Sequence, residues 1–310
     1  MFKKAILLIP AIGACVNAQT ITQIFGNGAN TFSIDFVEIG NAGNEADTTG
    51  DPNPAGRVDY IYNLGKYEIS RDMINKANLA AGIGISLADM TNYSGNGENR
   101  PATGISWYEA AGFINYLNTS QGYHVAYNLI QSPLRVDLWD SADAWQIGGE
   151  NLLRHKDAYY FLPNENEWYK GAYGSPSGAW YNFPTGSDSA PAGVSSGTDA
   201  DTAIYGRPIG PSDITSAGGL SGYGTMGQGG NVYEWSETAV GDSQILRGGA
   251  WDMDVVPEGG LLSSSVRDII PPWLEDSAVG FRVASVPEPS ALLLLAVGLG
   301  GLALVRRRRA

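Results

Sequence analysis

The sequence predicts a single α+β domain in which short helices and strands are joined by long loops. The chain has 310 residues, of which 43% are hydrophobic and only 16% are charged, and it contains 41 Gly and 16 Pro. Such a composition is typical of one globular domain that is rich in irregular chain. Helix and strand patterns are interspersed along the sequence, with no internal repeat or domain linker. We therefore expect one mixed domain between two terminal signals.

Four segments have the pattern of short strands. In the first, Phe32, Ile34 and Phe36 alternate with other residues, which is typical of a half-buried strand. The predicted strands span residues 31–39, 60–69, 244–248 and 279–285. Two segments rich in small and turn-forming residues, 40–57 and 174–230, are predicted to be loops, and the second is long enough to need packing or a ligand to stay ordered.

Capping residues predict three helices. Ser70 is an N-cap residue directly after the second predicted strand. Ser106 and Glu109 form a capping box, and Asn164 and Glu167 give the same signal further along the chain. The predicted helices span about 71–80, 107–119 and 165–173.

Residue types suited to acid–base chemistry are few. Glu165 and Glu167 lie in the first turn of the last predicted helix, where a negative charge is favoured, so we expect them to serve the helix N-terminus. A catalytic carboxylate pair, as in a hydrolase, is the alternative. His124 and His155 are the only histidines in the sequence, and we expect both to be ordinary surface or loop residues.

A glycine- and tryptophan-rich block organises the C-terminal third of the chain. It comprises GGNVYEW at 229–235 and LRGGAW at 246–251. Adjacent glycines allow positive φ and close backbone approach, so the first segment predicts a backbone-shaped site rather than a plain strand. Glu234 stands between two aromatic residues, and it must either stay in water or be buried with a partner such as a bound cation.

This block is part of a wider resemblance. Together with Arg267 and GFRV at 280–283, it resembles the C-terminal signature of the formylglycine-generating enzyme family, also called the sulfatase-modifying factor family. The segments LGKYEIS at 64–70, PATGISWYEAA at 101–111 and FLPNENEW at 161–168 follow in the family's order. The resemblance covers roughly residues 31–285, and it implies the C-type-lectin-like fold.

The resemblance also implies which redox chemistry to look for. Formylglycine-generating enzymes bind copper through two cysteines near the C-terminal Arg motif, and matching Arg267 to that motif puts Gly259 and Ser264 at the cysteine positions. The only cysteine in the sequence is Cys15, near the N-terminus. A hydroxyl and a hydrogen do not replace two thiolate ligands of Cu(I), so we expect no copper oxidase reaction.

Iron and calcium are the other metals that the resemblance raises. The related ergothioneine-pathway enzymes hold iron with three histidines, more than this chain has, so we expect no iron. The family's calcium site implies ligation by the carbonyls of Gly230 and Val232 and the carboxylate of Glu234, a set of hard oxygen donors that suits Ca²⁺ in a structural role. The family usually has Asp or Asn at the position of Gly227, so Gln228 or water is expected to supply that ligand.

Loop aromatics give the candidate ligand contacts. Trp180, Trp251 and Trp273 lie in predicted loops, where an amphipathic ring can stack on a sugar or anchor a peptide. Asp252 is a candidate for hydrogen bonding to such a ligand, with a solvated turn as the alternative. Arg267, the Arg of the C-terminal motif, completes the predicted contact set.

The first 18 residues predict export. Lys3 and Lys4 precede an apolar run, and Ala18 is a small residue at the expected cleavage point, which is the pattern of a secretory signal peptide. Removal by a signal peptidase is therefore expected. Cys15 follows a weak match to a bacterial lipobox, so lipidation there is the alternative to ordinary cleavage.

The C-terminus predicts sorting to the cell surface. Pro287-Glu288-Pro289 precedes an apolar run at 291–305, which is shorter than the ~20 residues that span a bilayer, and four arginines follow it. Residues 286–310 resemble the PEP-CTERM sorting signal. That resemblance implies a transmembrane helix at 291–305 that anchors the chain transiently, recognition by an exosortase, cleavage near Pro287, and release or display of the body. A permanent single-span anchor is the alternative.

Charge excludes some partners. The formal net charge is −13, and the body without its terminal signals keeps 13 basic and 31 acidic residues, a charge of −18, which disfavours nucleic acid and anionic lipid. The sequence therefore predicts an exported, non-catalytic domain that binds a polysaccharide or a protein of the cell surface or matrix. A metal-dependent oxidoreductase of the same family and a structural matrix component without a discrete ligand are the alternatives.

Overall fold

The computed structural model describes residues 20–206, 209–253 and 257–287. The predicted signal peptide, Cys15, the apolar run 291–305 and the arginine cluster lie outside these residues. Within the described part of the chain, no helix is both long enough and apolar enough to cross a membrane.

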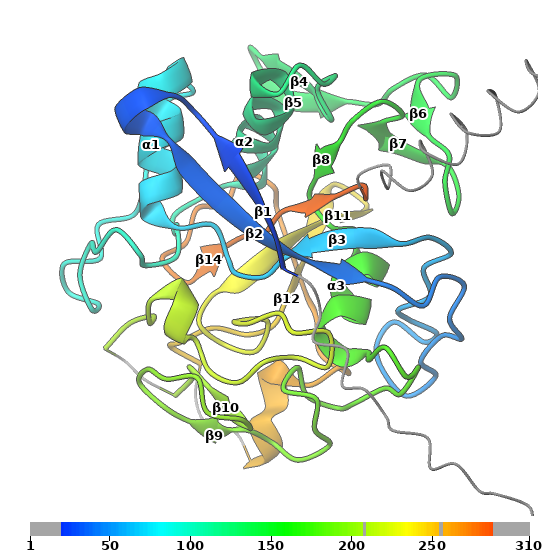
Figure 1. The fold of residues 1–310 in the computed structure, drawn as a ribbon, viewed down its shortest axis with the longest axis vertical. Helices are drawn as coiled ribbons and strands as arrows, with labels where there is room; N and C mark the ends of the chain where they lie inside the picture. Colours follow the sequence, from blue (N-terminus) through cyan, green and yellow to red (C-terminus); the bar gives the residue numbers. More distant parts are fainter. Residues whose placement is uncertain (1–19, 207–208, 254–256, 288–310) are drawn as a thin grey trace, which may run out of the picture.

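A five-stranded antiparallel sheet runs through the middle of the molecule (Figure 1). Its strands, in spatial order, are β1 (Thr20–Phe25), β2 (Phe32–Ile39), β3 (Tyr62–Gly65), β15 (Ala284–Ser285) and β8 (Tyr160–Phe161). Because β15 lies between β3 and β8, the last strand of the domain is inserted between two strands from much earlier in the chain. This closes the fold around one core.

A second sheet carries the glycine- and tryptophan-rich block. Its order is β13 (Asp268–Ile270), β12 (Ser243–Arg247), β11 (Tyr233–Val240) and β14 (Val279–Gly280), with only β11 and β14 parallel. Three two-stranded pairs lie outside the two sheets: β4 (Asn128–Gln131) with β5 (Leu134–Asp137), β6 (Ala144–Trp145) with β7 (Asn151–His155), and β9 (Ala192–Gly193) with β10 (Thr202–Ala203). Three 3₁₀ turns complete the elements: Gly28–Asn30, Ile214–Ser216 and Pro257–Leu262.

All three predicted helices are present and begin at the predicted caps. They are α1 (Arg71–Ala81), α2 (Trp107–Ser120) and α3 (Glu165–Tyr173). The Ser70 side chain accepts a hydrogen bond from the backbone of α1, and reciprocal capping boxes begin α2 and α3. Each cap satisfies backbone N–H groups that have no partner within the helix.

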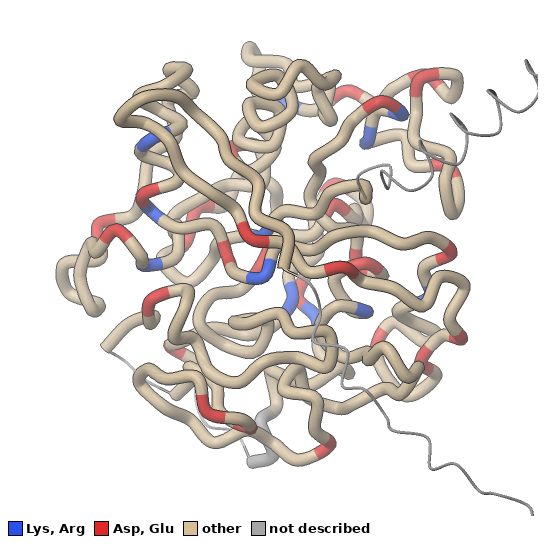
Figure 2. Tube along the Cα trace, viewed as in Figure 1, with Lys and Arg blue, Asp and Glu red and all other residues tan. Residues whose placement is uncertain are grey.

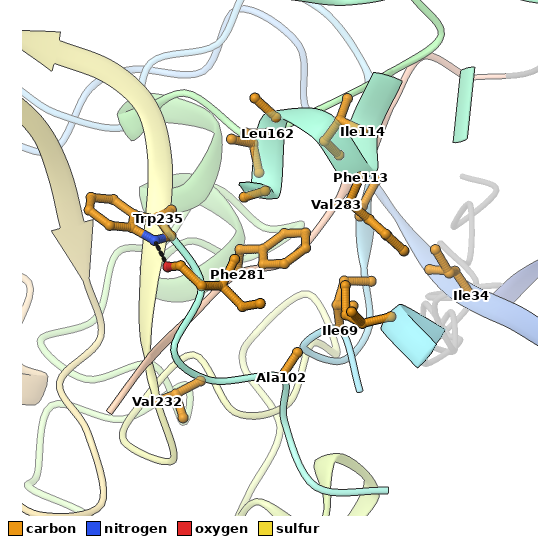
Figure 3. Close-up of a cluster of buried hydrophobic side chains, with 14 of the residues drawn as sticks. Ile34, Ile69, Ala102, Phe113, Ile114, Leu162, Val232, Trp235, Phe281 and Val283 are labelled. Atoms are coloured by element: carbon orange, nitrogen blue, oxygen red, sulfur yellow. Dashed lines mark hydrogen bonds between the residues drawn. The ribbon is translucent and has the colours of Figure 1, made fainter. Parts of the chain in front are cut away.

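The core lies between α2 and the two sheets. Figure 3 shows Phe113 and Ile114 of α2 close to Phe281 and Val283, the residues that connect β14 to β15. The Phe113 and Phe281 rings meet edge to face, with centroids 5.6 Å apart. In the same view, the buried Trp235 ring donates its N–H to the carbonyl of Ile105 at 2.7 Å, so its one polar atom is satisfied.

The structure corrects the strand predictions in three places. The predicted strand 60–69 is paired only over Tyr62–Gly65. The predicted strand 279–285 is two strands, β14 and β15, which lie in different sheets because Phe281 to Val283 pass through the core between them. The segment 233–235, for which we expected no plain strand, is the start of β11.

Within the segment 229–235, the backbone-shaped part lies in the turn before β11. Gly230 and Asn231 have φ of +75° and +60°. A Cβ on Gly230 would lie 2.2 Å from the carbonyl oxygen of Ile204, so only glycine fits there. Asn231 donates its backbone N–H to the same carbonyl at 2.7 Å. This contact ties the long segment 174–230 to the second sheet and explains how a predicted loop of that length stays ordered.

Candidate functional site

Three clusters of buried charge lie in the interior, and the first contains Glu234. Figure 2 shows basic and acidic positions meeting in the middle of the molecule as well as at its surface. Glu234 is fully buried and forms a two-pronged ion pair with Arg282, with N–O distances of 2.5 and 2.6 Å. The indole of Trp168 donates to the same carboxylate at 2.6 Å. Both Glu234 oxygens therefore have donors.

A second carboxyl, that of Glu68, lies beside this pair. Glu68 is buried, and it accepts hydrogen bonds from the Asn231 amide at 2.7 Å and the Val232 backbone at 3.3 Å. Burial raises the pKa of Glu68 well above its ordinary value, the neighbouring Glu234 adds to the rise, and Arg282 opposes it. A Cβ on Gly227 would lie 3.0 Å from the Glu68 carboxyl carbon. Glu68 thus fills the space beside the position where the related sequences usually carry Asp or Asn.

These contacts do not fit the expected calcium site. The Glu234 carboxylate is already neutralised by a guanidinium, which would repel a second cation. Gln228, the expected substitute ligand, donates to the Trp168 carbonyl at 3.1 Å and accepts from the Thr225 hydroxyl. Among the residues that the structure describes, no three His, Cys, Asp or Glu side chains form a group suited to a metal. The buried partner of Glu234 is Arg282.

This assignment makes a prediction about calcium. Glu234→Gln should lower the midpoint of thermal unfolding by the same amount in calcium and in chelator, because the lost partner is an arginine of the chain itself. Differential scanning calorimetry in both buffers measures the two shifts. A loss seen only in calcium would show that the ion, and not Arg282, is the partner of Glu234.

The second charge cluster lies at the position matched to the family's cysteines. Glu165 accepts from Arg247 at 2.6 Å and from Arg267 at 2.9 Å, and Arg267 also pairs with Asp51 at 3.3 Å. Ser264 is buried beside them: its carbonyl accepts from the Asp51 backbone at 3.2 Å and from Arg247 at 3.3 Å. Gly259 lies in the 3₁₀ turn Pro257–Leu262. The Ser264 position is therefore enclosed by ion pairs and by the loop that carries Asp51.

The third cluster joins α3 to β7 and β11. The buried Arg154 pairs with Glu167 at 2.9 Å and with Glu237 at 2.7 Å. Tyr127 and Asn151 donate to the two oxygens of Glu237, at 2.9 and 2.5 Å. Burial raises the pKa of Glu237, and Arg154 opposes this rise. Glu167 thus serves the α3 cap, as predicted, and also neutralises an arginine from another element.

An open cleft of about 650 Å³ lies over this third cluster. Its walls come from five parts of the chain: residues 57–60 before β3, Leu138, residues 145–153 of the β6–β7 hairpin, Asn164 and Asn166 at the start of α3, and residues 237–239 of β11. Glu237 and Asn151 form part of its floor. The cleft is within the ~300–1,000 Å³ range of small-ligand sites.

Comparison with known families identifies the family to which this domain belongs. Residues 35–286 match the family model of the sulfatase-modifying factor enzyme 1-like domain. The chain belongs to this family. Residues 285–309 match the PEP-CTERM protein-sorting motif, which supports an exported, cell-surface protein processed by an exosortase.

Solved structures confirm the fold of this sulfatase-modifying-factor-like domain. "Treponema denticola variable protein 1" is 19% identical with a TM-score of 0.58, and the match covers 86% of this chain and 99% of that one. "Crystal Structure of CarF" is 18% identical with a TM-score of 0.57, covering 82% and 99%. "Structure of PvdO from Pseudomonas aeruginosa" is 15% identical with a TM-score of 0.50, covering 86% and 98%. No curated protein sequence matches the chain significantly. The shared architecture is the C-type-lectin-like fold.

The domain places the three predicted loop tryptophans in different surroundings. Trp251 is buried, its ring contacts that of Tyr93 at a tilt with centroids 5.1 Å apart, and its N–H points at the Ser277 carbonyl, so it is not a surface platform. Trp180 is half-buried against Tyr169 at 5.6 Å and anchors the loop before β3. Trp273 is 64% exposed, as a ligand contact must be.

The two predicted polar contacts also differ. Asp252 is exposed next to the buried Trp251 and remains free to meet a ligand. Arg267 is part of the second charge cluster, where Glu165 and Asp51 hold its guanidinium, so its role in the domain is structural. Sequence reasoning missed the cleft altogether, because it is formed by segments that are far apart in the chain.

The two histidines of the domain stack on each other. The rings of His124 and His155 are 3.5 Å apart at 13°, and the Trp139 ring contacts the edge of the pair. His155 is buried, and its Nδ1 accepts the Asp157 backbone N–H at 3.1 Å. The expectation of two ordinary surface residues therefore holds for the exposed His124 and is wrong for His155.

This stack predicts a loss of stability in mild acid. Burial, then the neighbouring His124, lowers the pKa of His155, while Asp157 and Asp143 oppose the shift. Neutral His155 thus stabilises the fold fully above its unfolded pKa of ~6.5, and this contribution is lost as pH falls through the lower folded value. The free energy of unfolding should fall less between pH 7 and pH 5 in His155→Asn than in the parent chain. Parallel falls in both would exclude His155 as the cause.

Proposed function

We propose that this chain is an exported, non-catalytic member of its family that binds a polysaccharide or protein of the cell surface or matrix. The sorting motif at 285–309 supports display at, or release from, the cell surface after exosortase processing. We extend the processing to removal of residues 1–18 by a signal peptidase. The sulfatase-modifying-factor-like domain is then the part that meets the ligand.

The observation that carries the non-catalytic assignment is the enclosed Ser264. Its position matches a cysteine of the family's oxidases, yet its backbone and its surroundings are held by Asp51, Arg247 and Asn182. Beside it, Arg267 pairs with both Glu165 and Asp51. These residues present hydroxyl, carbonyl and guanidinium groups, none of which is a soft ligand for Cu(I). Metal analysis tests this directly, since stoichiometric copper or iron would favour the oxidoreductase alternative.

Trp273 supplies the exposed aromatic contact of the proposed function. It lies in a loop whose ends are fixed, because the Pro272 carbonyl accepts from Trp107 at 2.9 Å and the Asp276 carbonyl accepts from Gly104 at 2.8 Å. Leu274 is exposed beside it. A rigidly mounted, exposed indole gives a large contact area at a low cost in conformational entropy.

The expected result for Trp273→Ala is a loss of about thirtyfold or more in affinity for polymer extracted from the cell surface, which corresponds to the ~2 kcal/mol or more typical of aromatic hot spots. The measurement is a pull-down isotherm with the purified full chain. Leu79→Ala is the matched control, because Leu79 is also exposed but lies on α1. Equal affinities for the parent and Trp273→Ala would remove Trp273 from the contact surface.

A further inference from the structure

The cleft beside the β6–β7 hairpin has a chemistry of its own. We propose that it binds a short, uncharged oligosaccharide, which names a ligand class for the displayed domain and so rests on the proposed function. The cleft is separate from the Trp273 loop: none of its lining residues belongs to residues 271–277. Its volume of about 650 Å³ is sufficient for a ligand of several rings but its mouth is open, so the ends of a longer chain can extend into solvent.

The charges around the cleft disfavour an anionic ligand. Arg57 and Asp59 neutralise each other at 2.9 Å. Glu237 pairs with Arg154 and accepts hydrogen bonds from Tyr127 and Asn151, but Arg154 also pairs with Glu167, so this group of side chains keeps a net negative charge beside the cleft. Among the described lining residues, these pairings leave Glu150 as the charged group without an ion pair, and the body as a whole is acidic. An anionic saccharide would be repelled, and a neutral one would not.

Two amide groups provide free donors to the cleft. The Asn164 side-chain oxygen accepts the Glu167 backbone N–H at 2.9 Å, and the Asn166 side-chain oxygen accepts that of Gly56 at 2.9 Å. Each oxygen is thereby fixed, and within the described part of the chain neither amide NH₂ has a hydrogen-bond partner. Each amide thus has two N–H donors in a fixed orientation, which suits the oxygens of sugar hydroxyls.

Acceptors lie across the cleft from several elements. Glu150 takes a hydrogen bond from the Ser141 hydroxyl at one oxygen, and its other oxygen remains open. The Thr238 hydroxyl accepts the Glu165 backbone N–H at 2.8 Å, which leaves its own proton available to donate. A sugar hydroxyl both donates and accepts hydrogen bonds. A mixed set of amide, carboxylate and hydroxyl groups therefore suits a sugar better than it suits an apolar or an anionic ligand.

The walls add apolar surface for the C–H faces of sugar rings. Ile147 and Leu138 line the cleft with 55% and 58% of their surfaces exposed. The Trp145 indole donates to the Ile147 carbonyl at 2.8 Å, which fixes the hairpin that carries Ile147. A Cβ on Gly148 would lie 2.7 Å from the Tyr60 ring, so glycine lets the hairpin lie directly on that ring. The apolar wall is held in place before any ligand arrives.

The test uses titration calorimetry of the purified full chain with three probes: cellohexaose, chitohexaose and an oligogalacturonate of the same length. We expect saturable binding of at least one neutral hexasaccharide and none of the anionic one. Asn166→Asp and Asn164→Asp each keep the side-chain oxygen that accepts the backbone N–H, so the local backbone contacts are kept, and each replaces the NH₂ donor by a negatively charged oxygen acceptor. Each should weaken binding about tenfold, the effect of losing one good hydrogen bond to a ligand.

Trp273→Ala separates this proposal from the proposed function. It should leave oligosaccharide binding unchanged while it weakens binding of extracted surface polymer. Failure of both neutral hexasaccharides to bind, or binding by both Asn→Asp variants as tight as that of the parent chain, would overturn the cleft assignment. Preference for oligogalacturonate would contradict the charge argument. If the polymer does not bind but a neutral hexasaccharide does, the proposal for the cleft is supported and the proposed binding of a surface or matrix polymer is wrong.

Discussion

Arg282→Met should lower the free energy of unfolding by about 3–5 kcal/mol, the usual cost of removing one partner of a buried ion pair. Arg282 is fully buried, and its guanidinium is the only cation that contacts Glu234 in the described part of the chain. Without it, Glu234 and the adjacent Glu68 would be two buried carboxyl groups with no opposing charge. The carbonyls of Gly65 and Met226 would lose donors as well.

Urea unfolding of the purified chain measures this loss. Arg57→Met is the matched control, since Arg57 pairs with Asp59 at the surface and should contribute only about 0–1 kcal/mol. The double variant Arg282→Met with Glu234→Gln should recover part of the loss, because it leaves one fewer uncompensated charge and keeps an acceptor for Trp168. A loss below 1 kcal/mol in Arg282→Met would contradict the assigned role.

The second large effect is expected at Arg154. Arg154→Met should cost about 3–5 kcal/mol at pH 7, because Glu167 and Glu237 would both remain buried without a cation. Burial already raises the pKa of Glu237, and removing Arg154 would raise it further. A carboxyl whose folded pKa lies above its unfolded value of ~4.3 destabilises the fold at high pH, and this effect shrinks as pH falls toward that value.

The difference between Arg154→Met and the parent chain should therefore be smaller at pH 5 than at pH 7. Urea unfolding of both chains at the two pH values checks this. The pH-dependent contributions of His155 and of the other groups that both chains share cancel in the difference between the chains. Arg135→Met, which breaks an exposed pair with Asp137, should show a small loss that does not depend on pH in this range. An equal loss at both pH values in Arg154→Met would show that packing, and not charge, sets its effect.

Local signals account for the parts of the fold that the sequence predicted well. The capping pairs at Ser106 and Asn164 fix where α2 and α3 begin, because the side chain and the backbone groups that it satisfies are within four residues of each other. The alternation in β2 likewise depends only on neighbouring residues. The C-type-lectin-like fold itself was predicted from the resemblance to family motifs, because no local sequence pattern specifies it.

Long-range pairing explains what the sequence did not predict. Glu234 was expected to need a partner, but its partner Arg282 is 48 residues away, and no local feature shows which cation it will meet. The same holds for Glu165 and Arg247, which are 82 residues apart. One signal was available: Arg282 stands between Phe281 and Val283 in an apolar segment, where a charged side chain must find a buried counterion.

Among the candidate ligand residues, too, the sequence predicted local structure but not long-range packing. Trp251 and Trp273 both lie in predicted loops, yet one is covered by Tyr93 and the other is exposed. Burial of a loop side chain depends on which distant segments pack over it. The cleft depends on such packing entirely, because the β6–β7 hairpin, α3 and the end of β11 form it only when folded together.

Binding of extracted surface polymer to the purified full chain tests the central claim most directly. The account predicts a saturable isotherm that is the same in calcium and in chelator, because the buried charges of the domain are paired with one another. The bound polymer should be recovered chemically unchanged. No saturable binding, or turnover of the polymer or of a thiol substrate by the metal-loaded chain, would contradict a non-catalytic binding domain.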